Sequence, residues 1–183
     1  MKGRVRAGKN SSGFTLMEII VTCAILAILA AVAIPAFSSW LPEYRLKSAV
    51  RDLYSNTQLA RVMAIKNNES YRMIFITTED GAYIIQKPDG TTERTINFLD
   101  YDSNGNIGYG GGNATKSATK SGGSIPTDGV SYGSNVATFN PRGLGSSGYV
   151  YLANSTGTAY AIGRWSSGII VLKKWNNSTN SWE

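Results

Sequence analysis

The chain has 183 residues, enough for one modest domain plus a long helix rather than two domains, and it contains no histidine and a single cysteine, Cys23. Without histidine, the commonest general base and the usual zinc ligand are missing, and one cysteine cannot form an intrachain disulfide. The formal net charge is +6, and four of the basic residues, Lys2, Arg4, Arg6 and Lys9, lie within the first 13 residues, which contain no acidic residue. The remainder carries 14 basic against 12 acidic residues, so its charge gives no indication of a nucleic-acid-binding surface.

An uncharged apolar run extends from Ile19 to Phe37. Its 19 residues are about enough to cross the ~30 Å hydrocarbon core of a bilayer as a helix. Because basic residues precede the run and stay on the cytoplasmic side, we expect a single-pass inner-membrane protein whose N-terminus is cytoplasmic and whose downstream chain lies outside. Cys23 lies inside the run, where a small packing residue is a better interpretation than a reactive thiol.

Glu18 lies at the edge of this run, where a carboxylate costs roughly 2.5 to 3.5 kcal/mol on insertion scales. An ordinary anchor would avoid it. If the chain is cut between Gly13 and Phe14, the new α-amino group lies four residues from Glu18. In a packed assembly the Phe14 amine of one subunit can pair with Glu18 of a neighbour, and such a pair is much stronger in an apolar bundle than in water.

The run Gly13-Phe14-Thr15-Leu16-Met17-Glu18 resembles the class III leader of the type IV pilin and type II secretion pseudopilin superfamily. The resemblance implies cleavage after Gly13 by the prepilin peptidase, N-methylation of Phe14 and assembly through Phe14 and Glu18. It also implies that the partners are other pilin or pseudopilin subunits, an inner-membrane assembly platform and, before assembly, membrane lipid. Pro35 falls where the family helix commonly carries a proline.

Two simpler interpretations remain for the N-terminal segment. A conventional secretory signal would use Ala31-Val32-Ala33 as its signal-peptidase site. A plain single-pass anchor would explain the length of the apolar run. Neither interpretation explains Glu18, and a secretory signal gives Gly13 no purpose.

Residues 38–68 have the pattern of a helix with one apolar face. Pro42 is expected to bend this helix near Leu41 without ending it, and Asn67-Asn68 provides a stop signal. A continuous helix from Phe14 to Lys66 would be about 80 Å long, a stalk for the rest of the chain. The face expected to press on a sheet is formed by Leu46, Val50, Leu53, Thr57, Ala60 and Ala64.

The end of this helix resembles a narrower group, the GspH/FimT-like minor pseudopilins. Ala60, Arg61, Ala64, Lys66 and Asn67 follow the Ala-Arg-x-x-Ala-x-x-Arg/Lys-Asn pattern with which that group typically ends the helix. Any amphipathic helix favours basic residues near its negative C-terminal end, so the pattern alone is a weak indicator. After a pilin-like leader it indicates the subgroup.

Residues 69–183 alternate polar and apolar side chains in short runs separated by turn residues such as Glu79-Asp80-Gly81 and Pro88-Asp89-Gly90. The predicted strands are 71–77, 82–87, 92–99, 136–140, 149–153, 158–164 and 169–175. We therefore expect an α+β, pilin-like fold, in which a long N-terminal transmembrane and stalk helix packs on a small antiparallel β-sheet head of two sheets.

The segment 100–129 is rich in Gly, Ser, Thr, Asn and Lys, and we expect a flexible surface loop that buries no core. Its Asp100, Asp102 and Asn104 imitate the start of an EF-hand, but position twelve is Gly111 instead of a bidentate Glu. A polar hairpin tip is therefore favoured and no cofactor is expected, with calcium as the alternative. The repeat that contains Lys116 and Lys120 is interpreted as a solvated tract.

Aromatic residues near the C-terminus, among them Trp165, Trp175 and Trp182, could form a stacking face, although aromatics in strands more often pack against cross-strand neighbours. DNA-uptake members of the subgroup are expected to carry a Gly-Arg-x-Arg stretch here. Gly168-Ile169-Ile170-Val171 has neither arginine, and Gly163-Arg164-Trp165-Ser166 keeps one. Nucleic acid is therefore not an expected partner.

These features predict a structural subunit and not an enzyme. The expected organisation is a leader at 1–13, the transmembrane half of the helix at 14–37, its amphipathic half at 38–68 and a periplasmic β head at 69–183. The resemblance implies a minor pseudopilin of a type II protein secretion system, which initiates or tips a periplasmic pseudopilus after prepilin peptidase cleavage. Alternatives are a FimT-like minor pilin of a type IV pilus, acting in adhesion or DNA uptake, and a membrane-anchored binding domain that never polymerises.

Overall fold

The structure is a computed structural model that describes residues 13–78, 81–119, 121–165 and 167–183, without the side chain of Ala36. Contacts between residues group the chain into two compact units, of which the first ends at Ser39 and the second is Trp40–Glu183. Some residues used in the sequence analysis lie outside the described part of the chain: the basic residues Lys2, Arg4, Arg6 and Lys9, the turn residues Glu79 and Asp80, Lys120 of the repeat, and Ser166.

One helix, α1, spans Leu16–Asn67 and passes from the first unit into the second. Pro42 lies inside it, so the expectation that this proline does not end the helix is confirmed. After Asn67 the chain turns at Asn68, whose φ of 53° is a left-handed conformation that asparagine tolerates. The amides of Asn68 and Glu69 donate to the carbonyls of Ile65 and Ala64, which leaves two terminal carbonyls satisfied and confirms the predicted stop.

The part of α1 in the second unit buries one face. Its buried positions are three or four residues apart, the spacing of one face of a helix, and Asn56 is the only long polar side chain among them. The predicted apolar face is therefore confirmed. The buried residues are Leu46, Ala49, Val50, Leu53, Asn56, Thr57, Ala60 and Ala64.

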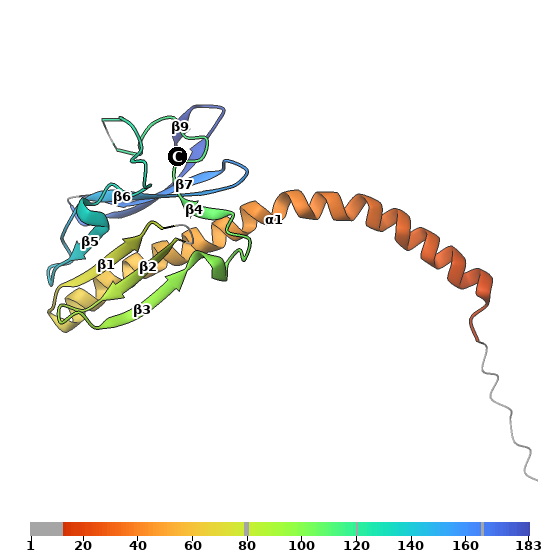
Figure 1. Ribbon diagram of the computed structural model, residues 1–183, viewed down its shortest axis with the longest axis horizontal. Coiled ribbons are helices and arrows are strands. Elements are labelled where there is room, and N and C mark those ends of the chain that lie inside the picture. Colours follow the sequence, from red (N-terminus) through yellow and green to blue (C-terminus); the bar gives the residue numbers. More distant parts are fainter. Residues whose placement is uncertain (1–12, 79–80, 120, 166) are drawn as a thin grey trace, which may run out of the picture. The chain divides into compact units, whose positions relative to one another are not determined.

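Two antiparallel sheets complete the second unit. The first sheet has the strand order β3-β2-β1-β5, made of Thr92–Asn97, Ala82–Gln86, Tyr71–Ile76 and Val136–Phe139. Figure 1 shows β1, β2 and β3 lying along the second half of α1. In β1 the residues facing the helix alternate with more exposed ones, as expected for a strand with one buried face.

The second sheet has the order β4-β6-β7-β8-β9, made of Ile107–Tyr109, Gly148–Asn154, Ala159–Arg164, Ile170–Asn176 and Ser181–Trp182. Short 3₁₀ turns, η1 at Phe98–Asp100 and η2 at Gly133–Asn135, connect β3 to β4 and precede β5. All seven predicted strands are present within two residues of their predicted ends, and the structure adds the short strands β4 and β9. The predicted α+β, pilin-like fold class is confirmed.

The main core lies where the second half of α1 meets the inner faces of both sheets, with side chains such as Leu53, Met73, Phe139 and Leu152. A smaller cluster lies on the opposite face of the second sheet and contains Ala118, Tyr149, Tyr151 and Ala161.

The expectation that segment 100–129 buries no core is wrong. Ile107 belongs to the main core and forms part of β4, while Ala118 is 3% exposed and belongs to the smaller cluster. The composition misled because a segment poor in apolar residues can still lie on an apolar surface when its backbone groups find hydrogen-bond partners there. Its flexibility stays a prediction.

Candidate functional site

The N-terminus of α1 is capped by a hydrogen bond between Thr15 and Glu18. The backbone amide of Glu18 donates to Thr15 Oγ1 at 3.2 Å, and the amide of Ile19 donates to the Thr15 carbonyl at 3.2 Å. Thr15 is thus the N-cap residue, and Glu18 stands at the third helical position, so this bond is the threonine half of a capping box. The sequence carries a signal for this role, Thr-x-x-Glu directly before an apolar run. This signal was not among the features predicted above.

Glu18 lies four residues after Phe14, and both residues are exposed. Its negative charge suits the positive end of the helix dipole. Among the ion pairs of the described residues, none involves Glu18.

Thr22, the polar residue inside the apolar run, is satisfied within the helix. Its hydroxyl donates to the carbonyl of Glu18 at 2.5 Å, a contact one turn back along α1. A threonine bonded in this way does not present a free hydroxyl to an apolar surrounding, so Thr22 does not interrupt the apolar surface.

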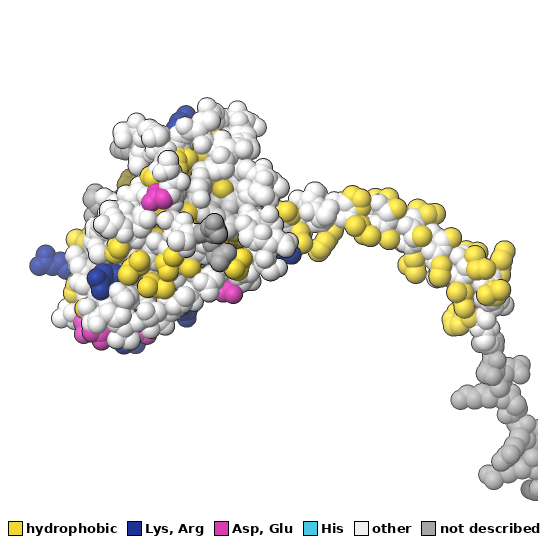
Figure 2. Space-filling model, viewed as in Figure 1, with side chains coloured by type: hydrophobic (Ala, Val, Ile, Leu, Met, Phe, Trp, Pro, Cys, Tyr) yellow, Lys and Arg dark blue, Asp and Glu magenta, His cyan; other side chains and the backbone are white. Residues whose placement is uncertain are grey.

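The first part of α1 has an apolar surface that nothing in its own unit covers. Leu16–Pro35, with 20 residues, is long and apolar enough to cross a membrane, and every large apolar side chain described between Leu16 and Phe37 is exposed. Figure 2 shows hydrophobic side chains around this part of the helix. Water would make such exposure unfavourable, so the surface fits lipid or other apolar helices, as in the membrane anchor of a pilin-like protein.

The three calcium candidates do not share one role. Asp102 is 2% exposed and accepts hydrogen bonds from Arg45 Nη1 at 2.9 Å, the amide of Asn104 at 3.1 Å and Asn106 Nδ2 at 3.1 Å. Asp100 and the side chain of Asn104 are exposed. Both carboxylate oxygens of Asp102 are thus engaged by protein donors, and these contacts tie the turn after η1 to α1.

No cluster of metal-ligating side chains accompanies these residues in the part of the chain that the structure describes. In the described ranges, no three His, Cys, Asp or Glu side chains come close enough to share an ion. Cys23 is a free thiol on the exposed surface of the apolar run.

The C-terminal aromatic residues pack against one another more than they form an open face. Trp175 and Trp182 meet edge to face at 5.2 Å between ring centroids, and Trp182 lies 5.6 Å from Tyr151. Trp165 is the more open indole, at 43% exposure.

Arg164, the single arginine retained at this end, is 1% exposed. It donates to the carbonyl of Ser146 and lies over the Phe139 ring at 5.5 Å. Burial, the largest influence, lowers the pKa of its guanidinium from the ordinary value. The side chain is thus a buried structural group and not an exposed cation.

Two family models match the chain. The type II transport protein GspH matches residues 49–168, from α1 in the second unit to the turn after β7, which is more than half of the chain. The prokaryotic N-terminal methylation motif matches residues 8–34, which include Gly13, Phe14 and Glu18. No curated protein and no solved structure matches the chain.

The two matches fit the two units of the structure. The methylation motif covers the apolar start of α1, and the GspH match covers the part of the helix that packs on the antiparallel sheets. The chain therefore belongs to the GspH family of type II transport proteins and is a pilin-like minor pseudopilin.

Proposed function

We propose that this protein is a structural subunit of a type II secretion pseudopilus, which it initiates or tips. In this proposal the chain is cut between Gly13 and Phe14 by the prepilin peptidase, and Phe14 is N-methylated. The mature subunit then leaves the inner membrane through an assembly platform and joins other pseudopilins. Its N-terminus starts in the cytoplasm, its β-structure lies in the periplasm, and it performs no catalysis.

One observation carries the proposal. α1 begins with an exposed apolar surface of 20 residues, and the acid at its start, Glu18, forms no ion pair with any described residue. A carboxylate in an apolar environment needs a positive partner, and the amine released at Phe14 of a neighbouring subunit supplies one at matching depth. The match to the N-terminal methylation motif supports the same processing.

The burial of Arg164 favours secretion over DNA uptake. Binding to nucleic acid requires arginine or lysine side chains that reach phosphates, and the guanidinium of Arg164 is covered and bonded to Ser146. A titration of the protein with duplex DNA is expected to give no salt-dependent complex at micromolar protein.

Mass spectrometry of the protein from its native membrane tests the processing step. The expected mature chain begins at Phe14 and carries one added methyl group at its amine. A chain that retains its first 13 residues, or one that begins near Ala33, would contradict the proposal.

Substitution of Glu18 tests assembly, and the choice of residue separates the ion pair from the helix cap. Glu18→Gln keeps a side chain that can serve in a capping box but removes the charge. We expect filament incorporation of Glu18→Gln to fall about ten-fold or more, since the loss of a buried ion pair exceeds ~1.4 kcal/mol. Membrane insertion should be unimpaired, because an uncharged residue is easier to insert.

Glu43→Gln is the matched control, since Glu43 lies further along α1 and forms an exposed ion pair with Lys174. It should be incorporated like the unmodified protein. Normal incorporation of Glu18→Gln would reject the ion pair, and a loss seen with Glu18→Ala but not with Glu18→Gln would assign Glu18 to capping alone.

A further inference from the structure

The outer face of the second sheet, the face turned away from α1, is a shallow trough lined by aromatic rings. Its middle strand β7 presents small residues, Ala161 and Gly163. Its neighbour β6 presents Tyr149 and Tyr151, whose ring centroids lie 6.2 Å apart. The Tyr149 ring lies so close over Gly163 that a Cβ there would be 2.3 Å from it, so the small residues of β7 are needed for the trough.

The chain covers part of this trough itself with residues 113–119, which we call the strap. Three side chains of the second sheet bind backbone atoms of the strap. Tyr151 Oη accepts from the amide of Ala118 at 2.9 Å, Lys173 Nζ donates to the Ala118 carbonyl at 3.3 Å, and Trp182 Nε1 donates to the Lys116 carbonyl at 2.7 Å. These bonds do not depend on strap side chains, so the trough binds a peptide backbone.

The strap buries two neighbouring small side chains, Ser117 and Ala118. Ala118 is 3% exposed and packs in the cluster with Tyr149, Tyr151 and Ala161. The hydroxyl of Ser117 bonds to Thr119 and to the carbonyl of Gly122, while Lys116 is exposed and Thr119 is half-buried. In sequence, Ala118-Thr119-Lys120-Ser121 repeats Ala114-Thr115-Lys116-Ser117, so the strap matches the trough at a small residue and not through a unique sequence.

Beyond Ala118 the strap leaves the trough before the trough ends. The amide of Gly122 donates to the Thr119 carbonyl at 3.1 Å, and the amide of Ser117 donates to the Gly123 carbonyl at 2.8 Å, so the chain turns back on itself. Next to Thr119, the strap leaves a cavity of about 470 Å³ open, within the size range of ligand pockets.

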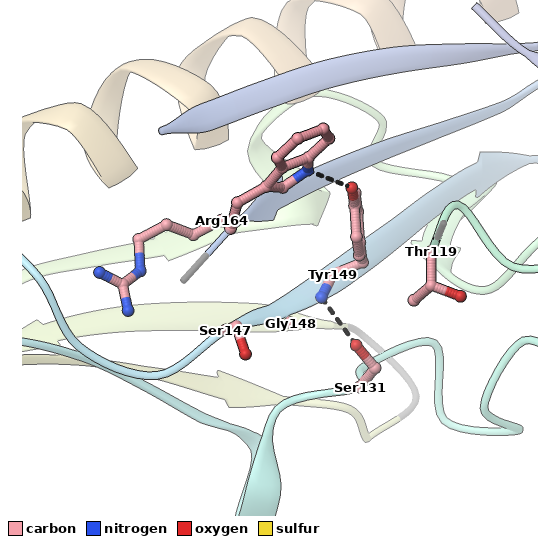
Figure 3. Close-up of a pocket in the computed structure, with 7 residues that line it drawn as sticks. Thr119, Ser131, Ser147, Gly148, Tyr149 and Arg164 are labelled. Atoms are coloured by element: carbon pink, nitrogen blue, oxygen red, sulfur yellow. Dashed lines mark hydrogen bonds between the residues drawn. The ribbon is translucent and has the colours of Figure 1, made fainter. Parts of the chain in front are cut away.

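The cavity is lined by two aromatic residues, by three residues with hydroxyl groups, and by Gly148 and Arg164 (Figure 3). Trp165 Nε1 donates to Tyr149 Oη at 2.8 Å, and the amide of Tyr149 donates to Ser131 Oγ at 2.7 Å. Ser147 also lines the cavity, and Figure 3 shows the guanidinium of Arg164 directed away from Tyr149 and Thr119. None of the described residues that line the cavity is acidic, and the two aromatic rings suit an apolar side chain better than a charged one.

We propose that the outer face of the second sheet is a binding groove for an extended peptide of another polypeptide, which displaces the strap. A small residue of that peptide takes the place of Ala118, and a large apolar residue directly after it fills the cavity at Tyr149 and Trp165. The strap makes the backbone bonds but leaves the cavity unfilled. A peptide that makes the backbone bonds and also fills the cavity can therefore displace the strap. The strap thus limits binding to ligands that carry the apolar residue.

The test uses the full chain in lipid nanodiscs and a fluorescent peptide, Thr-Lys-Ser-Ala-Phe-Lys-Ser, with anisotropy as the readout. The peptide should bind the unmodified protein, and replacing its Phe by Ser should weaken binding about ten-fold, because the cavity is then empty. Ala118→Asp places a charge where the strap is buried and should release the strap. The variant is expected to bind the Phe peptide about ten-fold more tightly, since competition by the strap is removed.

One matched pair of variants and one cavity-filling variant place the peptide on the groove. In the Ala118→Asp variant, where the strap no longer competes, Lys173→Met removes a donor to the peptide backbone and should weaken binding. Lys174→Met in the same variant removes the same charge from the next residue, which bonds to Glu43, and should leave binding unchanged. Ser147→Phe fills the cavity and should abolish the preference for Phe over Ser in the peptide.

Hydrogen exchange on the unmodified protein gives a readout that does not depend on a variant folding. Saturating Phe peptide should speed amide exchange in residues 115–119 while β6 and β7 are unchanged or slower. No binding together with unchanged exchange would overturn the proposal, as would binding that ignores Lys173→Met and Ser147→Phe. Binding of an oligosaccharide, but no peptide, to the Ala118→Asp variant would also overturn it.

Discussion

Asp102 shows how one buried carboxylate can organise a loop. Its three donors come from two parts of the chain, since Arg45 belongs to α1 while Asn104 and Asn106 belong to the turn that follows η1. The carboxylate is almost completely buried, and the Arg45 side chain is 33% exposed. The pair is thus shielded on one side, so removing one partner should cost more than at a surface ion pair and less than at a fully buried one.

We predict that Asp102→Ala lowers the free energy of unfolding by about 2 kcal/mol, because hydrogen bonds to charged groups are worth ~1.5 to 3 kcal/mol and partial exposure of Arg45 reduces the loss. Asp100→Ala, at an exposed neighbouring acid, should change it by less than about 0.5 kcal/mol. Chemical denaturation of the full chain in detergent measures both. Calcium should not raise the melting temperature, and a clear rise that Asp102→Ala removes would instead support the calcium site.

Deprotonation of the buried Tyr83 phenol makes the stability of the fold depend on alkaline pH. Burial raises its pKa from 10.0 to about 12, against the opposing effect of the hydrogen bond from Asn56. Burial also raises the pKa of Tyr109 and of Tyr132. The folded protein holds these phenol protons more tightly than the unfolded chain. The corresponding stability is therefore fully present below the unfolded pKa and is lost as pH rises through the folded one.

For Tyr83 alone, the free energy of unfolding should fall by up to about 1.4 kcal/mol per pH unit between pH ~10 and ~12. Tyr83→Phe should remove the contribution of this one phenol to the fall of the unfolding free energy with pH. It should also lower the free energy of unfolding by about 1 kcal/mol at neutral pH, because the hydrogen bond with Asn56 is lost. Urea unfolding at several pH values measures both effects. A slope that Tyr83→Phe leaves unchanged would assign the titration to the other tyrosines.

At the scale of elements, α1 combines two different surfaces on one helix. Its first part is apolar all round, and its second part is apolar on one face only, with residues that recur every three or four positions. The sequence predicted this second pattern well because helical periodicity extends over many residues and does not depend on distant partners. By contrast, β4 and β9 have three and two residues, too few for any alternation to be recognised.

The buried face predicts unequal effects of two truncations on the same helix. Leu53 is 1% exposed and Val62 is 55% exposed. Leu53→Ala should lower the free energy of unfolding by about 3 kcal/mol, through lost burial and a residual cavity, and Val62→Ala by less than about 0.5 kcal/mol. Thermal unfolding of the two variants provides the comparison, and equal losses would mean that α1 does not pack on the sheets through this face.

For the molecule as a whole, the exposed apolar part of α1 is expected to hold the protein in the membrane. Leu26→Lys places a charge near the middle of Leu16–Pro35, at a cost of about 2.5 to 3.5 kcal/mol on insertion scales. We expect this variant to be extracted from membranes by alkaline carbonate, whereas Ser48→Lys, at an exposed position outside the span, should stay in the membrane fraction. Full retention of Leu26→Lys would contradict a bilayer-spanning role for this segment.

The sequence by itself determined the family, the apolar span, the helix and the seven longer strands, because each depends on residues that are close together along the chain. Only the tertiary structure decided that Asp102 bonds to Arg45, that Arg164 is buried, and that the strap lies on Tyr151, Lys173 and Trp182. Composition misjudged segment 100–129 for the same reason. Whether a polar, glycine-rich segment is buried depends on the hydrogen-bond partners that distant strands bring to it, and no local pattern records which partners those will be.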